Sequence, residues 1–563
     1  MITKVAVVEP PFIEPGMPYP DIIQVSAALK SLGVDAFPLD LNVKLYRSIL
    51  QDDSTTYSPG LFVASAQKAF FAETKEPGST IKVGRIGLDI MSLFSKLQSH
   101  ALPFFTGKIF RPSHSDYVMY SELLNAFLDC RVKEIDPRFE LWLDHFSSSV
   151  DIHYPESVFN GIWGEKSNIL KLYDKYFGRI GVLEPTGDIM ILIRKEEQLF
   201  PGLALSYWLT SRGHSKVTLA GDFLTCVLTM KFPKEMFKLC DCVILHPLEY
   251  CLRSWVGEKT HPNIIKSFRL LTRINSCSAM TFETLPFQFE AVNTDEYLSP
   301  ISVSGVQITS RCYWSRCKFC NLAKAIVHPF RQCNHSVFNT KLETLEKYSH
   351  LKHLQFLDYA LPFSLFNDRL KTRKLSSLRW AAQVRFERLC LDTTFFENLY
   401  KKGCRALSWG FESGSSRLLE DMGKGGVTQI DERKEILKRA ADAGISNHLF
   451  LISGYPGEEH HDFMDTIEFL TENIEVFHSV ETYAFQPIYG TKAYSDLLKK
   501  GMITKKGEWN LKASYLDEEL QNAAESKNRF IDENFLRLGA VNRCNDLLEG
   551  HMAFQYLLRR NEQ

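Results

Sequence analysis

Short hydrophobic runs alternate with segments of helical periodicity in the first half of the chain. Strands are expected where about four to eight apolar residues stand between turn-forming residues, and helices where apolar residues recur every three or four positions. Five strands are predicted on this basis, in the segments KVAVVEPP, DAFPLDLN, DIMILI, KVTLAGD and CDCVILHP. Residues from about 43 to 177 have mainly helical and aromatic patterns, which indicates a helical insertion. Strands separated by helices favour an α/β fold with a parallel, doubly wound sheet.

A second series of strand and helix patterns begins near residue 299. Six strands are predicted in it, in the segments GVQITS, HLQFLD, RWAAQVRF, RALSWGFE, SNHLFLIS and VETYAFQP. Repeated strand–helix units predict a parallel sheet that is closed or partly closed into a barrel. We therefore expect a Rossmann-like domain over residues 1–285, a barrel over 299–489, and a charged, mainly helical C-terminal region over 490–563.

Length and charge limit the class of protein. A chain of 563 residues exceeds what one hydrophobic core supports, so more than one domain is expected. The net charge is −1, which gives no indication of a nucleic-acid-binding surface or a polybasic membrane anchor. The N-terminal segment does not have the pattern of a signal peptide, and no run reaches the roughly 18 apolar residues that span a bilayer. A cytoplasmic location is expected, where thiols stay reduced.

Three cysteines are crowded into one predicted loop. Cys312, Cys317 and Cys320 lie within nine residues of the segment ITSRCYWSRCKFCNLAKA, and such thiol clusters in reduced proteins indicate metal binding or catalysis. Structural zinc needs four ligands, which Cys317, Cys320, Cys333 and His335 could supply. An iron–sulfur cube held by three cysteines instead leaves one iron open to a cofactor or substrate. The loop follows the first barrel strand at its carboxyl end, where such barrels keep their chemistry, and this position favours the cluster.

Three stretches in the second half of the chain resemble one enzyme family. The segment RCYWSRCKFC resembles the cysteine motif of the radical S-adenosylmethionine (radical SAM) enzymes, with one residue more in the first gap than their usual Cys-x3-Cys-x2-Cys. This longer spacing is similar to a variant found in members that carry a cobalamin-binding domain. GCRALSWGFESGSSRLLEDMGKG and FLISGYPGEEHHDFMDTIEFL resemble the fourth-strand and fifth-strand segments of the family. The resemblance covers residues 305–487 and implies a partial (β/α)6 barrel with a 4Fe–4S cluster and S-adenosylmethionine.

The resemblance also implies which residues hold these groups. Cys312, Cys317 and Cys320 would ligate iron. Residues in the cysteine loop and at the carboxyl ends of the later strands would contact S-adenosylmethionine, namely Phe319, Asp358, Tyr359, Arg385, Glu412, Ser413, Ile452 and Gly454. Lys424 and the run 458–461 are instead expected to be solvated side chains.

The resemblance also implies which part of the cofactor four of these side chains would contact. Asp358 is expected near the methionine amine. Arg385 is expected near the methionine carboxylate as a bidentate donor, with a surface arginine as the alternative. Glu412 and Ser413 would bond the ribose hydroxyls, and a helix N-cap at Ser413 or Ser415 is compatible with that role.

The first half of the chain resembles the cobalamin-binding domain of the same subgroup. The segments VAVVEPPFIEPGMPYPDIIQVSAALKSLG, QLFPGLALSYWL and VTLAGD carry this resemblance, and they imply contacts to cobalamin from Pro10, Pro11, Gln198 and Gly221. The usual lower-ligand motif Asp-x-His-x-x-Gly is missing, since the similar run 151–156 ends in glutamate. Cobalamin would then be held without a protein histidine on cobalt. The alternative is a domain that binds substrate or braces the barrel.

The resemblances together imply a reaction. We expect a radical SAM enzyme that methylates an unactivated carbon of a natural product or peptide with the help of cobalamin. The alternatives are a cobalamin-independent radical rearrangement, epimerisation or oxidation, and a zinc-stabilised binding protein without radical chemistry. The implied partners are a small-molecule or peptide substrate and an external electron donor such as flavodoxin or ferredoxin, with no nucleic acid and no membrane.

Overall fold

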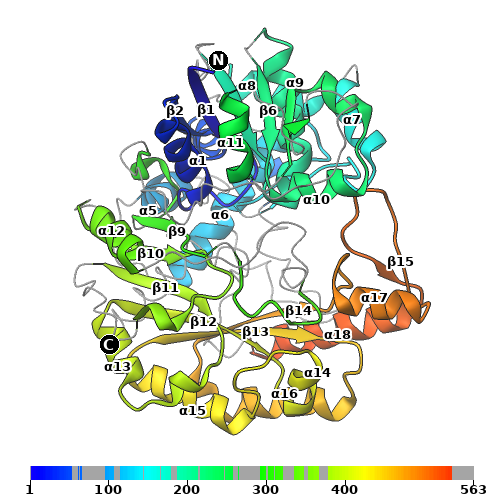
Figure 1. The fold of residues 1–563 in the computed structure, drawn as a ribbon. Helices are drawn as coiled ribbons and strands as arrows, with labels where there is room; N and C mark the ends of the chain where they lie inside the picture. Colours follow the sequence, from blue (N-terminus) through cyan, green and yellow to red (C-terminus); the bar gives the residue numbers. More distant parts are fainter. Residues whose placement is uncertain are drawn as a thin grey trace. The chain divides into compact units, whose positions relative to one another are not determined.

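The computed structural model describes most of the chain. The described residues are 2–52, 61–62, 64–65, 96–106, 114–143, 145–164, 167–178, 187–213, 216–245, 248–257, 264–265, 292–299, 302–309, 311–320, 335–347, 351, 353–366 and 378–535. They form two compact units (Figure 1). The described residues up to 303 belong to the first unit, and those from 304 to 535 belong to the second. None of the helices in the described ranges is long and apolar enough to cross a bilayer.

The first unit is built on a six-stranded sheet in the order β2-β1-β5-β6-β7-β8. Its strands are β1 (Lys4–Glu9), β2 (Asp35–Asp40), β5 (Asp188–Leu192), β6 (Val217–Ala220), β7 (Cys242–Ile244) and β8 (Ile264–Ile265). All five predicted strands are present and pair in parallel, and the two-residue β8, which was not predicted, adds an antiparallel edge. The strand order reverses between β1 and β5, so a crevice is expected at their carboxyl ends.

Helices and one small hairpin complete the first unit. They are α1 (Pro20–Ser31), α2 (Leu41–Leu50), α5 (Leu102–Phe105), α6 (His114–Lys133), β3 (Glu140–Leu141), β4 (Phe146–Ser147), α7 (Pro155–Trp163), α8 (Asn168–Tyr176), α9 (Leu199–Thr210), α10 (Asp222–Met230) and α11 (Leu248–Val256). α2 begins directly after β2 because Asp40 caps it, with its Oδ1 accepting a hydrogen bond from the amide of Val43 at 2.9 Å.

The second unit is a partial barrel of six parallel strands in the order β14-β13-β12-β11-β10-β9. Its strands are β9 (Val303–Val306), β10 (His353–Phe356), β11 (Arg379–Val384), β12 (Cys404–Glu412), β13 (Ser446–Ser453) and β14 (Ser479–Ala484). All six predicted strands are present. The strands follow one another in sequence order, and β9 and β14 stand at the two ends of the sheet. The expected half-closed (β/α)6 arrangement is therefore confirmed.

The second unit contains several helices, most of which cover one face of this sheet (Figure 1). They are α12 (His335–Glu346), α13 (Phe395–Lys401), α14 (Ser416–Asp421), α15 (Ile430–Asp442), α16 (His460–Glu472), α17 (Lys492–Lys499) and α18 (Glu518–Phe535), and a hairpin is formed by β15 (Ile503–Thr504) and β16 (Ser514–Tyr515). Trp409 contacts Phe396 of α13, and Phe411 contacts Phe469 of α16. Because side chains alternate along a strand, Ser408 and its neighbours two residues apart face the interior of the barrel.

Candidate active site

The cysteine loop leaves the carboxyl end of β9 and is fixed to other parts of the barrel by its backbone. Cys312, Cys317 and Cys320 are partly buried and are not joined in disulfides. The amide of Lys318, between the last two cysteines, donates to the carbonyl of Met422 at 2.9 Å, and its own carbonyl accepts from the amide of Ala493 at 2.9 Å. The loop is thus pinned between the end of α14 and the start of α17.

Trp314 locks the first half of the loop onto a glycine-rich turn. Its Nε1 donates to the carbonyl of Gly423 at 2.8 Å. Gly425 lies against the indole, and a Cβ at this position would stand 2.0 Å from a ring carbon of Trp314. Gly425 also has a φ of 57°, a conformation that favours glycine. The segment 423–426 therefore needs its glycines to approach the cysteine loop.

A buried ion pair lies beside this turn. Nζ of Lys424 is 2.6 Å from Oε1 of Glu412, and the two residues are 6% and 7% exposed. Glu412 ends β12 at a shift of register and has a φ of 63°. The ammonium of Lys424 lies 5.9 Å from the ring centre of Phe319. The expectation that Lys424 is a solvated side chain is therefore wrong, because the turn after α14 folds back onto the cysteine loop.

These charges act on the thiol of Cys317. Burial raises the pKa of Cys317, and the cations of Lys424 and Arg385 oppose that rise. Burial of an unpaired thiolate would be unfavourable, so cations at this position favour the deprotonated sulfur that binds iron. The only signal for Lys424 in the sequence is a faint one, a single lysine set among three glycines after a short helix.

Arg385 follows β11 and is 7% exposed, so the surface-arginine alternative is wrong. Its guanidinium lies 4.5 Å from the ring centre of Trp314 and 5.7 Å from that of Tyr313, and its Nη2 donates to the carbonyl of Lys424. Its Nη1 is buried and has no hydrogen-bond partner among the residues that the structure describes. A buried guanidinium donor without an acceptor is suited to an anion such as a carboxylate.

Asp358 braces the strand that leads into the cysteine loop. Its carboxylate accepts hydrogen bonds from the amides of Ile308 and Thr309 at 3.1 and 2.6 Å and from Oγ1 of Thr309 at 2.5 Å. Burial raises the pKa of Asp358 to about 6, although these donors oppose the rise. Its neighbour Tyr359 is 51% exposed. The described contacts of Asp358 therefore hold the end of β9, and its expected contact to the methionine amine stays a prediction.

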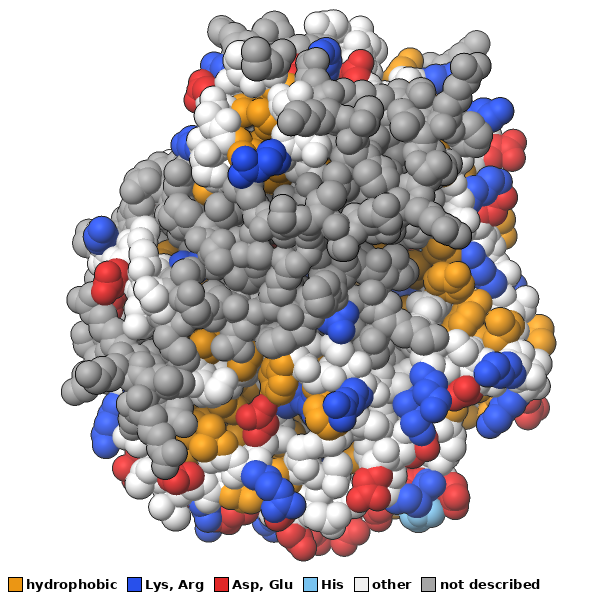
Figure 2. Space-filling model, viewed as in Figure 1, with side chains coloured by type: hydrophobic (Ala, Val, Ile, Leu, Met, Phe, Trp, Pro, Cys, Tyr) orange, Lys and Arg blue, Asp and Glu red, His pale blue; other side chains and the backbone are white. Residues whose placement is uncertain are grey.

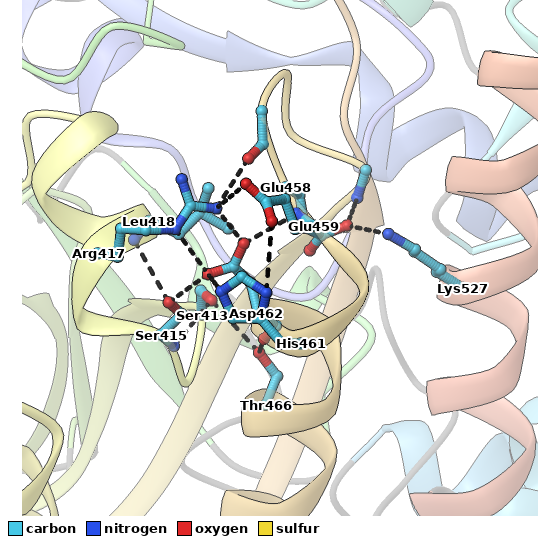
Figure 3. A network of polar contacts seen from close by, with 12 residues as sticks. Ser413, Ser415, Arg417, Leu418, Glu458, Glu459, His461, Asp462, Thr466 and Lys527 are labelled. Atoms are coloured by element: carbon cyan, nitrogen blue, oxygen red, sulfur yellow. Dashed lines mark hydrogen bonds and ion pairs between the residues drawn. The ribbon is translucent and has the colours of Figure 1, made fainter.

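Ser413 belongs to a polar network between β12, α14 and α16 (Figure 3). It is 1% exposed, its Oγ accepts from the amide of Ser415 at 3.1 Å, and it lies 3.3 Å from Oγ1 of Thr466. The N-cap of α14 is Ser415, whose Oγ donates to Oδ1 of Asp462 at 2.5 Å. Asp462 also accepts from Nε of Arg417 at 3.2 Å. Of the two serines considered for the cap, Ser415 has that role.

Ile452 and Gly454 lie at the carboxyl end of β13. Ile452 packs against the same hydrophobic cluster as Phe319. Gly454 has a φ of 73°, and a Cβ there would stand 2.2 Å from the Cβ of Ala524 in α18. Its amide donates to Oε2 of Glu458 at 2.9 Å, and the same oxygen is 2.6 Å from Nζ of Lys527.

The side chain of Glu458 is only 3% exposed, so its expected solvation is wrong, because it joins β13 to α18. The rest of the run 458–461 is exposed as expected.

A layer of polar side chains crosses the interior of the barrel, before the carboxyl ends of the strands. The strand register aligns Gln383, Ser408, His448 and Ser479 on four neighbouring strands. His448 is 3% exposed, with Nδ1 2.7 Å from Oγ of Ser479 and Nε2 3.4 Å from Oε2 of Glu481. Burial lowers the pKa of His448 to about 3, so the imidazole is neutral near pH 7. No local pattern in the sequence marks these residues, because their alignment depends on strand register.

In the first unit, the residues expected near cobalamin stand at the carboxyl ends of β1, β5 and β6. Nε2 of Gln198 donates to Oε1 of Glu9 at 2.5 Å and to the carbonyl of Pro10 at 3.0 Å. Pro11 follows Pro10 and is buried. A Cβ at Gly221 would stand 2.1 Å from the carbonyl oxygen of Ile193, so this crossing requires glycine.

Glu9 completes this edge of the sheet. Its side chain is fully buried, and its Oε2 has no hydrogen-bond partner within the described ranges. Burial raises the pKa of Glu9 to about 7, while Arg194, 3.0 Å away, opposes the rise. Gln198 therefore positions the end of β1 through its contact with Glu9.

The zinc alternative draws on Cys333, which lies outside the described residues. No group of three His, Cys, Asp or Glu side chains within the described ranges is placed to hold one metal ion. A 4Fe–4S cluster places each cysteine on a separate iron. Three cysteine side chains in one loop that is fixed by its backbone, with cations beside one of them, fit that donor set.

The chain is similar in sequence to parts of two curated proteins. It is 28% identical over 165 residues to a tRNA-2-methylthio-N(6)-dimethylallyladenosine synthase of Natranaerobius thermophilus, which covers 28% of this chain and 34% of that relative. It is 26% identical over 248 residues to an uncharacterized methyltransferase of Pyrococcus horikoshii, which covers 42% of this chain and 49% of that relative. The chain thus matches half or less of each relative's length, and no protein-family model matches it.

Two solved structures share its architecture along nearly the whole chain. The radical S-adenosylmethionine methyltransferase TsrM of Kitasatospora setae, solved with cobalamin and a [4Fe-4S] cluster, has a TM-score of 0.56 at 11% identity and covers 100% of this chain and 98% of its own. The cobalamin-dependent S-adenosylmethionine radical enzyme OxsB, solved with aqua-cobalamin, has a TM-score of 0.54 at 12% identity and covers 95% of this chain and 67% of its own. Because the identities are this low, the likeness shows a shared fold alone.

Proposed function

We propose that this chain, which has the fold of the cobalamin-dependent radical SAM enzymes, is itself a radical SAM enzyme that methylates a carbon atom with the help of cobalamin. The observation that carries the proposal is the cysteine loop, pinned by its backbone at the carboxyl ends of the barrel strands, with the cations of Lys424 and Arg385 beside the thiol of Cys317. Sequence similarity to a curated methyltransferase over 248 residues supports the same class of reaction.

Cys312, Cys317 and Cys320 would hold a 4Fe–4S cluster. When bound, such a cluster supplies the electron that splits S-adenosylmethionine into methionine and a 5′-deoxyadenosyl radical. The hydrogen bonds from Lys318 to Met422 and from Ala493 to Lys318 keep the loop in place. Tight packing around the loop would also exclude water from the reacting atoms.

The charged side chains beside the loop would orient S-adenosylmethionine. Nη1 of Arg385, which has no hydrogen-bond partner among the described residues, would donate to the methionine carboxylate. Glu412 would accept from the ribose hydroxyls, while Lys424 neutralises its buried charge. Phe319 and Ile452 pack against one hydrophobic cluster and would offer an apolar surface to adenine.

Three further residues would act near the cofactor in other ways. Asp358 would act chiefly through Ile308 and Thr309, by fixing the strand end from which the loop departs. Tyr359 is half-exposed. Ser413 is tied into the α14–α16 network, so its contribution to ribose binding would depend on that network.

Cobalamin would bind beyond the carboxyl edge of the first sheet and would carry the methyl group. Pro10, Pro11 and Gly221 would shape the surface, and Gln198 would hold Pro10 through its carbonyl. The reaction we propose is methylation of an unactivated carbon in a natural-product or peptide substrate. The polar layer around His448 favours a substrate with hydrogen-bonding groups.

Cofactor occupancy tests the proposal directly. After anaerobic reconstitution with iron and sulfide, the wild type should hold about four irons per chain and retain added hydroxocobalamin on desalting. Cys317→Ala should lose most of the iron. The control Cys390→Ala, which changes a buried cysteine outside the loop, should keep it. Iron without retained cobalamin would favour the cobalamin-independent reactions, and zinc in place of iron would overturn the proposal.

A further inference from the structure

The segment that follows the last barrel strand differs in charge from the rest of the chain. Residues 489–516 contain six lysines against Asp496 and Glu508, a net charge of +4, whereas the whole chain carries −1. All six lysines are exposed, namely Lys492, Lys499, Lys500, Lys505, Lys506 and Lys512. The segment therefore presents a basic surface, whereas the rest of the chain carries a net charge of −5.

Hydrophobic side chains are exposed among these lysines. Leu498 of α17 is 50% exposed, Leu516 after β16 is 60% exposed, and Tyr489 before α17 is 40% exposed. Figure 2 shows hydrophobic and basic side chains together on the right of the view, over the region of α17 and β15. Exposed hydrophobic side chains that gather in one place mark sites that bind another molecule, and the lysines around them favour an acidic partner.

This surface is joined directly to the cysteine loop. The amide of Ala493, in the first turn of α17, donates to the carbonyl of Lys318 between Cys317 and Cys320. Phe319 packs against a hydrophobic cluster to which α17 contributes Ala493, Tyr494 and Leu497. The outer face of α17 is thus separated from the loop by about one helix diameter, roughly 10 Å.

We propose that α17 and the β15–β16 hairpin form the docking surface for a small acidic one-electron carrier protein of the flavodoxin class. The inference rests on the proposed function, because reductive cleavage of a sulfonium needs an electron from outside the chain. The carrier would give one electron to the cluster that Cys312, Cys317 and Cys320 would hold, and no atom or proton would move. Charge complementarity would speed the encounter, and Leu498, Leu516 and Tyr489 would supply the apolar contact.

A charge-reversal variant with a matched control tests the surface. The test variant is Lys499→Glu, Lys500→Glu and Lys506→Glu. The control is Lys401→Glu, Lys434→Glu and Lys438→Glu, which makes the same change of charge on exposed lysines of α13 and α15. Labelled flavodoxin is titrated against each protein at low and at high salt.

The dissociation constant of flavodoxin should rise about tenfold in the test variant and much less in the control, and salt should weaken wild-type binding. S-adenosylmethionine cleavage should fall in the test variant when reduced flavodoxin is the donor, yet match the wild type when dithionite is the donor. Loss of cleavage with both donors in the wild type would instead contradict the proposed function, so the two failures are distinguishable.

Two outcomes would overturn the docking proposal. One is equal flavodoxin affinity in the wild type and the test variant. The other is flavodoxin binding that is absent in the wild type while tRNA or anionic phospholipid vesicles bind the same lysines, which would assign the surface to another class of partner. Unchanged absorbance of the reconstituted cluster in the test variant confirms that its fold is intact.

Discussion

Nζ of Lys424 lies 2.6 Å from Oε1 of Glu412, and both side chains are buried beside the loop that carries Cys317. Lys424→Met would leave the carboxylate of Glu412 buried without its counter-ion. We expect the free energy of unfolding to fall by about 3 kcal/mol and the affinity for S-adenosylmethionine to fall at least tenfold. Denaturant unfolding and calorimetric titration of the reconstituted protein measure the two effects.

The double variant Lys424→Met with Glu412→Gln separates the two effects of Lys424. Removal of the buried charge should restore part of the stability but not the affinity, since Glu412 is itself proposed to accept from the ribose hydroxyls. Lys434→Met, at an exposed position of α15, is the control. Wild-type affinity in Lys424→Met would exclude the lysine from the site.

Gly425→Ala should loosen the cysteine loop. The new methyl group would overlap the indole of Trp314 and displace it from the carbonyl of Gly423. Iron incorporation should therefore decrease several-fold. Gly457→Ala is the matched control, because Gly457 also has a positive φ, 93°, but has open space where a Cβ would stand. The control should lose about 1 kcal/mol of stability and keep its iron, and equal iron in both variants would contradict the role of Trp314.

His448 should make the stability of the protein depend on pH. Burial lowers the pKa of the folded-state imidazole to about 3, whereas the unfolded chain titrates near 6.5. Between these values only the unfolded state binds the proton, so the folded state loses up to about 1.4 kcal/mol per unit as the pH falls. Asp358, whose pKa is raised to about 6, acts in the opposite sense between about pH 4 and 6.

The contribution of His448 is isolated by comparison with His448→Gln. Asp358 is common to both proteins, so its effect cancels in the difference. Urea unfolding from pH 7 to pH 4 should show a steeper loss of stability in the wild type than in the variant. Parallel curves would show that the folded protein takes up a proton on His448 as readily as the unfolded chain does, which would contradict the lowered pKa.

Asp462 should stabilise the junction of α14 and α16. Burial acts to raise the pKa of Asp462, but hydrogen bonds from Arg417, Ser415 and the amide of Glu459 outweigh it and lower the pKa to about 2. Asp462→Asn should reduce the free energy of unfolding by about 2 kcal/mol. Asp465→Asn changes an exposed residue of the same helix and should leave stability within about 0.5 kcal/mol of the wild type.

The strands could be predicted from the sequence because each has a strong local signal. Val5–Val8 and Ile189–Ile193 are continuous apolar runs, as buried parallel strands require. The cysteine loop could also be predicted from a short stretch of sequence, since three thiols within nine residues have few structural explanations. In contrast, β8 spans two residues, too few to give a periodic pattern.

The contacts of the site depend on approaches between distant segments. In the sequence Lys424 resembles a surface residue, but it is buried because the turn after α14 packs on Trp314. Glu458 is buried only because α18 brings Lys527 against it. The His448 layer depends on the register of four strands, which a single sequence does not specify. Lys424 and Glu458 were assigned wrongly, and the layer around His448 was not identified, because their environments depend on tertiary contacts.

The central claim is that the three loop cysteines hold a cluster that cleaves S-adenosylmethionine. The most direct test is chromatographic measurement of 5′-deoxyadenosine formed by anaerobically reconstituted protein with dithionite. We predict that the wild type accumulates the product and that the variant with Cys312→Ala, Cys317→Ala and Cys320→Ala does not. Equal amounts from both proteins, or none from a wild type that holds its full iron, would contradict the claim.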